Sequence, residues 1–166
     1  MVRICLFFLL LSFLSCSNSE SNKTPPAPSK IESLGLISCD AILDREVEVY
    51  LPVGYSSDKK YPVVYMHDGQ NLFRERKDSG WGGDEWGVDE ALDTLGHDII
   101  VVGIYNTAKR YEDYMPAKPY DLVNEKIAND EDVQRWAPDA VIVSDQYLDC
   151  LVNTIKPMID QKYATL

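Results

Sequence analysis

The stretch that decides the fold is YPVVYMHDGQNLF, residues 61–73. Its first six residues form a short apolar run, rich in β-branched and aromatic side chains, without alternation between polar and apolar positions. Such a run is typical of a strand that is covered on both faces, as in the parallel sheet of an α/β protein. Pro62 suits the start of a strand, where an N–H is not needed for pairing.

A polar turn, HDGQN at 67–71, directly follows this predicted strand. Gly69 gives the turn a residue that adopts positive φ without strain. In open α/β sheets, ligands bind where the carboxyl ends of strands meet such turns. The turn is therefore the best candidate for a functional site.

The remaining elements follow from the pattern of apolar residues. Residues 34–43 predict a first strand, and the alternation at 46–51 predicts a half-buried second strand, which together form an antiparallel edge. Residues 86–95 predict a helix that ends at Gly96, and IIVVGI at 99–104 predicts another buried strand. Residues 144–161 predict an amphipathic helix in which Pro157 either causes a kink or begins the last turn. The polar segments at 74–85 and 106–139 are expected to be loops, the second partly helical near 130–136.

Length and composition indicate one globular domain and exclude two classes of partner. The chain has 166 residues, of which 45% are hydrophobic and 26% are charged. Its net charge of -11 repels phosphate backbones and anionic lipid surfaces. We therefore expect neither nucleic-acid binding nor direct adsorption to a membrane.

Residues 1–16 predict an export signal, because Arg3 precedes an apolar stretch at 4–14 that is too short to span a bilayer. FLSC at 13–16 resembles a bacterial lipoprotein cleavage site, with Cys16 as the lipidated residue; the alternative is an ordinary secretory signal. The expected location is the bacterial periplasm or outer membrane, with membrane contact only through the lipid on Cys16. Residues 17–30 are polar with three prolines and predict a flexible tether, followed by the folded domain at 31–166.

Two cysteines, Cys39 and Cys150, lie in the predicted folded domain. Sequence alone does not give the distance between them, so a disulfide stays open. Two buried free thiols are the favoured interpretation.

Several motifs, in order, resemble the putative esterase family of α/β-hydrolases, which includes esterase D-like and enterochelin-esterase-like proteins. They are YMHDGQNLF at 65–73, WGVDEAL at 86–92, VGIYN at 102–106, RYEDYMP at 110–116 and the segment 147–160. The resemblance covers roughly residues 44–163 and implies an α/β-hydrolase-type sheet. It also implies a serine carboxylic-ester hydrolase that acts by acyl transfer on a small ester or acylated sugar, without a cofactor.

The resemblance also implies roles for individual residues. The backbone at Gly69 and Gln70 would form part of the oxyanion hole. Without the resemblance, these residues would be explained as a tight turn that needs a glycine. His67 is expected to orient this turn by hydrogen bonding rather than to act as the catalytic base, and His97 to be a solvated loop residue. Candidates for lining the substrate cleft, with packing roles as the alternative, are Trp81, Trp86, Arg110, Glu112 and Tyr114.

A group of acidic residues near the first helix does not predict a metal site. These residues, Asp84, Glu85, Asp89 and Glu90, lack the spacing of a calcium-binding loop. A solvated helix start explains them, because carboxylates are favourable near a helix N-terminus.

The sequence contains no G-x-S-x-G motif, which carries the nucleophile in α/β-hydrolases. In the resembled family this motif would follow just after Tyr163. The sequence therefore predicts the N-terminal half of an esterase domain, truncated before the serine, the acid and the histidine of the triad. The alternative is a non-catalytic surface lipoprotein that binds carbohydrate. A fragment of this kind is expected to expose residues 63–66 as an apolar sheet edge and to aggregate.

Overall fold

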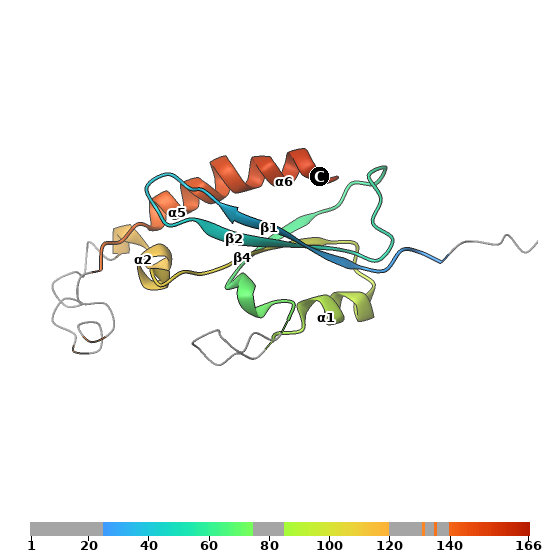
Figure 1. Ribbon diagram of the computed structural model, residues 1–166, viewed down its shortest axis with the longest axis horizontal. Coiled ribbons are helices and arrows are strands. Elements are labelled where there is room, and N and C mark those ends of the chain that lie inside the picture. The colour runs from blue at the N-terminus through green and yellow to red at the C-terminus, as the bar shows by residue number, and fades with distance from the viewer. Residues whose placement is uncertain (1–24, 75–84, 120–130, 132–134, 136–139) are drawn as a thin grey trace, which may run out of the picture.

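The computed structural model describes residues 25–74, 85–119, 131, 135 and 140–166. Within these residues, a four-stranded mixed sheet lies between two helical layers (Figure 1). The predicted α/β fold class is confirmed.

The strands of the sheet are β1 (Lys30–Ile37), β2 (Arg45–Leu51), β3 (Val63–His67) and β4 (Ile100–Ile104). Their spatial order is β1-β2-β4-β3. β1 pairs antiparallel with β2, β2 pairs antiparallel with β4, and β4 pairs parallel with β3. The predicted antiparallel edge beside a parallel strand pair is thus confirmed, although β1 begins and ends earlier than predicted.

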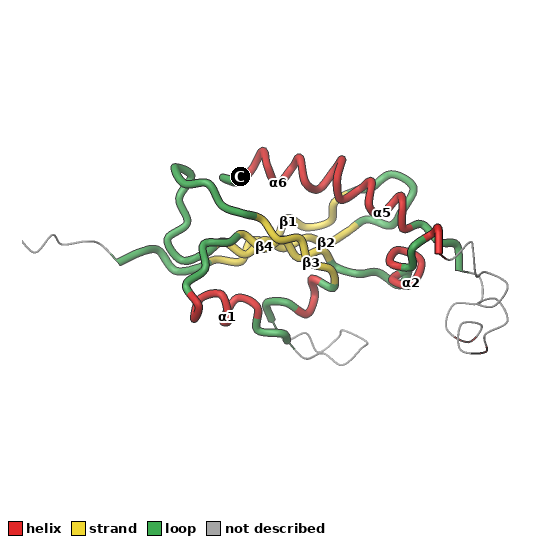
Figure 2. The backbone as a smooth tube through the Cα atoms, turned by 180° about the vertical axis from the view of Figure 1, so that it is seen from behind, coloured by secondary structure: helices red, strands yellow, loops and turns green. Residues whose placement is uncertain are grey.

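The two faces of the sheet carry different helices (Figures 1 and 2). α5 (Ser144–Cys150), η2 (Leu151–Ile155) and α6 (Lys156–Lys162) follow one another as a single long helix over one face. η1 (Gly69–Asn71) and α1 (Val88–Leu95) lie on the other face. The side chains of β4 alternate between the two cores: Ile100, Val102 and Ile104 join the larger core under α5 and α6, and Val101 joins the smaller core under α1.

β4, and not β3, is the central strand that is covered on both faces. All five residues of β4 are buried, whereas β3 has half-buried and exposed residues, with Val64 43% exposed. The expectation of a strand covered on both faces at 61–66 is therefore wrong. The expectation that residues 63–66 form a sheet edge agrees with the strand order, in which β3 is the last strand. Its other edge is covered at its start, where the Tyr61 N–H donates to the Ala164 carbonyl at 2.9 Å and the Leu166 N–H donates to the Tyr61 carbonyl at 2.9 Å.

Pro157 does not break the long helix, because a π-helical turn at Leu151–Ile155 precedes it. Proline lacks an N–H and its ring crowds the carbonyl four residues before it. A wider turn at this point accommodates both effects without ending the helix. The predicted helix at 144–161 is otherwise confirmed.

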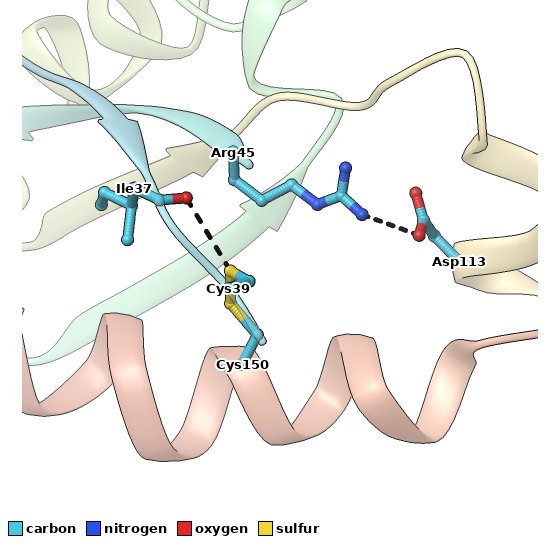
Figure 3. The surroundings of a disulfide bond; sticks show 5 residues. All are labelled: Ile37, Cys39, Arg45, Asp113 and Cys150. Atoms are coloured by element: carbon cyan, nitrogen blue, oxygen red, sulfur yellow. Dashed lines mark hydrogen bonds and ion pairs between the residues drawn. A yellow bond between two sulfur atoms is a disulfide. The ribbon is translucent and has the colours of Figure 1, made fainter. Parts of the chain in front are cut away.

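Cys39 and Cys150 form a disulfide that joins the turn after β1 to the last residue of α5 (Figure 3). Both residues are buried in the larger core, and their Cα atoms are 5.6 Å apart. The expectation of two free thiols is therefore wrong. The residues meet because the long helix packs directly over the turn between β1 and β2.

Part of the N-terminal segment lies outside the described residues, including the predicted signal at 1–16, its Cys16, and most of the predicted tether at 17–30. The last tether residues contact the domain: the Gly54 N–H donates to the Ala27 carbonyl at 2.8 Å, and the Ser29 hydroxyl donates to Asp93 at 2.6 Å. The predicted helical turn at 130–136 also lies largely outside the described residues. No helix in the described part of the chain has the length and apolarity that crossing a membrane requires.

Candidate active site

The turn at the carboxyl end of β3 begins with a residue in the left-handed region. Asp68 has φ 56° and ψ 41° and precedes η1. The Asn71 N–H donates to the Asp68 carbonyl at 2.9 Å, and the Leu72 N–H donates to the Gly69 carbonyl at 3.2 Å. The two preceding N–H groups, those of Gly69 and Gln70, donate to no acceptor among the described residues, as is usual for the first turn of a helix.

Glycine is needed at position 69 for close packing rather than for positive φ. A Cβ atom on Gly69 would lie 2.6 Å from the carbonyl carbon of Gly103 and 2.8 Å from the nitrogen of Ile104. Any larger residue would push η1 away from β4. The left-handed conformation expected of this glycine belongs instead to Asp68.

The carboxylate of Asp68 is buried and is held by two residues that follow β4. Arg110 donates from Nε to Oδ1 at 2.8 Å and from Nη2 to Oδ2 at 2.7 Å. The side-chain amide of Asn106 also donates to Oδ1, at 2.7 Å. The Arg110 hydrogen bonds, and then that of Asn106, hold the pKa of Asp68 below its ordinary value despite burial, so this carboxylate stays ionised well into the acidic range.

His67, the last residue of β3, contacts two tyrosines from other elements. Its Nδ1 lies 2.8 Å from the hydroxyl of Tyr147 in α5, and its ring lies 4.8 Å from the ring of Tyr114 in α2 (Arg110–Tyr114). Burial raises the pKa of Tyr147 far above its usual range. The hydrogen bond fits the predicted orienting role of His67.

A hollow of about 420 Å³ opens beside His67, between α2 and α5. Its walls include the rings of Tyr114 and Tyr147, together with Pro116 and Pro119. The hollow is therefore largely apolar, although Lys118 and Asp145 also line it, and it reaches the turn at His67.

The predicted cleft residues have different positions in the structure. Tyr114 lines the hollow, but the guanidinium of Arg110 binds Asp68. Glu112 is buried and pairs with Lys109 at 2.8 Å. Trp86 is 53% exposed and is joined through its backbone N–H to the carbonyl of Asn71. Trp81 lies outside the described residues.

Sequence reasoning missed Tyr147 and Asn106 as parts of this site. Tyr147 is 80 residues from His67, and Asn106 is 38 residues from Asp68. Asn106 could have been found, because it follows the end of β4, the strand that pairs with β3. The carboxyl ends of parallel strands meet at one edge of a sheet. Tyr147 gave no such signal, because its helical spacing indicated only a core position.

The structure brings three of the acidic residues together at the start of α1. One ligand atom from each of Glu85, Asp89 and Glu90 lies within 4.8 Å of the others. Burial raises the pKa of Asp89 to about 6, with a further contribution from the neighbouring Glu90. The charged form of Asp89 is therefore less favourable in the folded protein than in the unfolded chain.

We expect Asp89→Asn to raise the melting temperature at pH 7 by about 2–4 °C, which corresponds to about 1 kcal/mol for a chain of this size. The pKa of Asp89 rises from 3.8 in the unfolded chain to about 6 in the folded protein. Its contribution to stability is therefore fully present below pH 3.8 and is lost as the pH rises through about 6. Asparagine mimics the neutral acid, so the variant should melt like the wild type at pH 4. Thermal unfolding at both pH values checks this, and an equal gain at pH 4 would contradict it.

The fold and the site together define an α/β protein with a candidate active site at the carboxyl end of a parallel strand pair. The family model described as "Putative esterase" matches residues 43–166, which is most of the chain. The chain therefore belongs to the putative esterase family, as its motifs indicated.

Solved structures that resemble the chain include ferulic acid esterases. A CE1 ferulic acid esterase from Anaeromyces mucronatus, in complex with ferulic acid, is 19% identical, with 89% of this chain and 47% of that chain covered and a TM-score of 0.41. A second ferulic acid esterase is 18% identical, with 84% and 46% covered and a TM-score of 0.48. This chain thus spans about half the length of these structures. No curated protein matches it.

Proposed function

We propose that this chain supplies the oxyanion-binding part of a serine carboxylic-ester hydrolase. The observation behind the proposal is the pair of unpaired N–H groups, at Gly69 and Gln70, on a rigid turn at the carboxyl end of β3. Membership of the esterase family supports this role. In α/β-hydrolases one oxyanion donor comes from a loop of this kind, and the other is the N–H that follows the serine.

In this mechanism a serine Oγ attacks the ester carbonyl carbon while a base takes its proton. The electron pair of the C=O bond moves onto the oxygen, where the Gln70 N–H donates a hydrogen bond to the negative charge. Collapse of the intermediate re-forms the C=O bond and breaks the bond to the alkoxide oxygen, which takes the proton from the base and leaves as the alcohol. Water then attacks the acyl-serine in the same way, which releases the acid and returns a proton to the serine oxygen. The 166 residues contain no G-x-S-x-G, so we place the serine on residues outside this sequence.

The hollow beside His67 is our candidate for the substrate pocket. Its volume of about 420 Å³ is in the range of small-molecule sites. The rings of Tyr114 and Tyr147 offer flat apolar walls, which suit the acyl or sugar part of a small ester.

In a form of the protein that includes the nucleophile, we expect Gln70→Pro to lower kcat about 10²–10³-fold relative to Gln70→Ala, the usual loss for one oxyanion donor. Proline removes the N–H at the second residue of η1, where that N–H makes no backbone hydrogen bond. Alanine keeps the N–H and removes the same side chain, which accepts a hydrogen bond from the Asn106 N–H. Steady-state hydrolysis of p-nitrophenyl esters measures the ratio, and equal kcat values would exclude Gln70 as a donor.

The gene sequence gives a direct test of the proposal. We expect an in-frame G-x-S-x-G within about 30 codons after codon 166, at the place of the strand-to-helix turn that holds the serine. The 166-residue chain alone should not hydrolyse p-nitrophenyl esters. A stop codon directly after Leu166 would instead favour a non-catalytic protein that binds carbohydrate in the same hollow.

A further inference from the structure

Three groups from the segment after β4 converge on the turn that presents the Gln70 N–H. The guanidinium of Arg110 makes two parallel hydrogen bonds to the Asp68 carboxylate, at 2.8 and 2.7 Å. Asn106 donates from its side chain to Asp68 at 2.7 Å and from its backbone N–H to the Gln70 side chain at 3.1 Å. These four contacts join the end of β4 to the end of β3.

Asp68 needs this support because of its backbone conformation. Its φ of 56° lies in the left-handed region, which residues other than glycine adopt only when the surrounding structure imposes it. The direction of the next N–H groups depends on this φ, since Asp68 is the residue that precedes η1. Contacts that hold the Asp68 carboxylate therefore also hold the direction of the Gly69 and Gln70 N–H bonds.

We propose that Arg110 and Asn106 are positioning residues that hold Asp68 in its left-handed conformation and so aim the Gln70 N–H at the substrate carbonyl. This inference rests on the proposed function of the turn. It gives Arg110 a role different from the substrate contact that the sequence predicted.

The geometry separates this role from two others. Two of the three guanidinium nitrogens, Nε and Nη2, bind Asp68, and the group lies 5.0 Å from the centre of the Tyr114 ring. A substrate could contact only the remaining N–H groups, a role that a raised KM in Arg110→Ala would reveal. A contribution to global stability is expected to be small, because the Arg110 side chain is 55% exposed and exposed ion pairs contribute little. The role of Arg110 is therefore local, because its two parallel hydrogen bonds fix the orientation of the Asp68 carboxylate.

Amide hydrogen exchange on the full 166-residue chain tests the proposal without any catalytic assay. In Arg110→Ala we expect the Asn71 and Leu72 amides, which are bonded within the turn, to exchange about tenfold or more faster. The amides of β4 should keep their wild-type rates. Lys109→Ala is the matched control, because it removes the adjacent cation, which pairs with Glu112 at 2.8 Å.

The conservative variant Arg110→Lys keeps the charge but not the planar pair of donors. We expect it to restore the exchange rates in part and to leave the Gln70 amide resonance between its wild-type and Arg110→Ala positions. Wild-type exchange rates and an unmoved Gln70 resonance in Arg110→Ala would overturn the proposal. Faster exchange that spreads over β4 would also overturn it, because the role would then be general stability.

Kinetics in a form that hydrolyses esters adds a second readout. A positioning role predicts that Arg110→Ala lowers kcat and leaves KM unchanged, since the residue does not touch the substrate. A raised KM with unchanged kcat would overturn the proposal in favour of substrate binding. Absence of any esterase activity would contradict the proposed function, while the exchange experiment still decides whether Arg110 holds the turn.

Discussion

Removal of the Cys39–Cys150 disulfide should lower the free energy of unfolding by about 4–5 kcal/mol. The two cysteines are separated by 111 residues, and a cross-link over such a length restricts the unfolded chain more than a short one does. Domains of this size are stable by only about 5–15 kcal/mol. The disulfide should therefore contribute a large share of the stability of this domain.

Guanidinium denaturation of the oxidised wild type and of Cys39→Ala/Cys150→Ala measures this difference. Addition of a reductant should destabilise the wild type by a similar amount and leave the double variant unchanged. The reductant series is the more direct comparison, because the double variant also loses two buried sulfur atoms from the larger core. The 166-residue chain has four cysteines, so a titration of the denatured, unreduced protein should find two free thiols, and four would contradict the prediction.

The disulfide also bears on the site, because it fixes the helix that presents Tyr147. Cys150 lies three residues after Tyr147 in α5, so both side chains lie on the same side of the helix. Tyr147 bonds to His67 at the end of β3. Reduction should therefore loosen this wall of the hollow as well as the turn after β1.

Local sequence patterns predicted the elements well but not how far each strand is buried. Alternation at 46–51 and the apolar run at 99–104 correspond to β2 and β4, and Gly96, with φ 65°, ends α1 as predicted. The run at 61–66 looked as buried as that at 99–104, yet β3 is an edge strand of this sheet. Burial of a strand depends on which strands lie beside it, and composition does not specify that.

The position of the candidate site stays a prediction, and the contacts within it were only partly predictable. The turn at 67–71 could be located because it combines a strand end, polar residues and a glycine. The Arg110–Asp68 contact spans 42 residues and the Tyr147–His67 contact spans 80. Such pairs are brought together by sheet order and helix packing, so no spacing in the sequence reveals them. The same reason explains the missed disulfide.

The second large effect is expected at Arg45 and Asp113, a fully buried ion pair. Arg45 begins β2 and Asp113 lies in α2, and both side chains are 1% exposed. Arg45 Nη2 donates to Asp113 Oδ1 at 2.7 Å (Figure 3). The other guanidinium nitrogens of Arg45, Nε and Nη1, have no hydrogen-bond partner among the described residues. One hydrogen bond and the Tyr147 ring, 5.4 Å away, are thus the recorded partners of this buried charge.

Asp113→Ala should destabilise the protein by about 3–5 kcal/mol, because it leaves the Arg45 charge buried without a counterion. Burial raises the pKa of Asp113 above its ordinary value even though Arg45 attracts the charged form, so desolvation outweighs attraction at this carboxylate. Replacing both partners by apolar residues, as in Arg45→Met/Asp113→Leu, should therefore cost much less than the single substitution.

Chemical denaturation of the single and double variants measures both effects, with the exposed Lys59–Asp98 pair as the control. Both of its side chains are about half exposed, so Asp98→Ala should change the free energy of unfolding by less than about 1 kcal/mol. If the double variant lost as much stability as Asp113→Ala, attraction within the pair would exceed its desolvation cost. If Asp113→Ala lost no more than Asp98→Ala, water would have to reach Arg45, and β2 and α2 would pack less tightly than the structure shows.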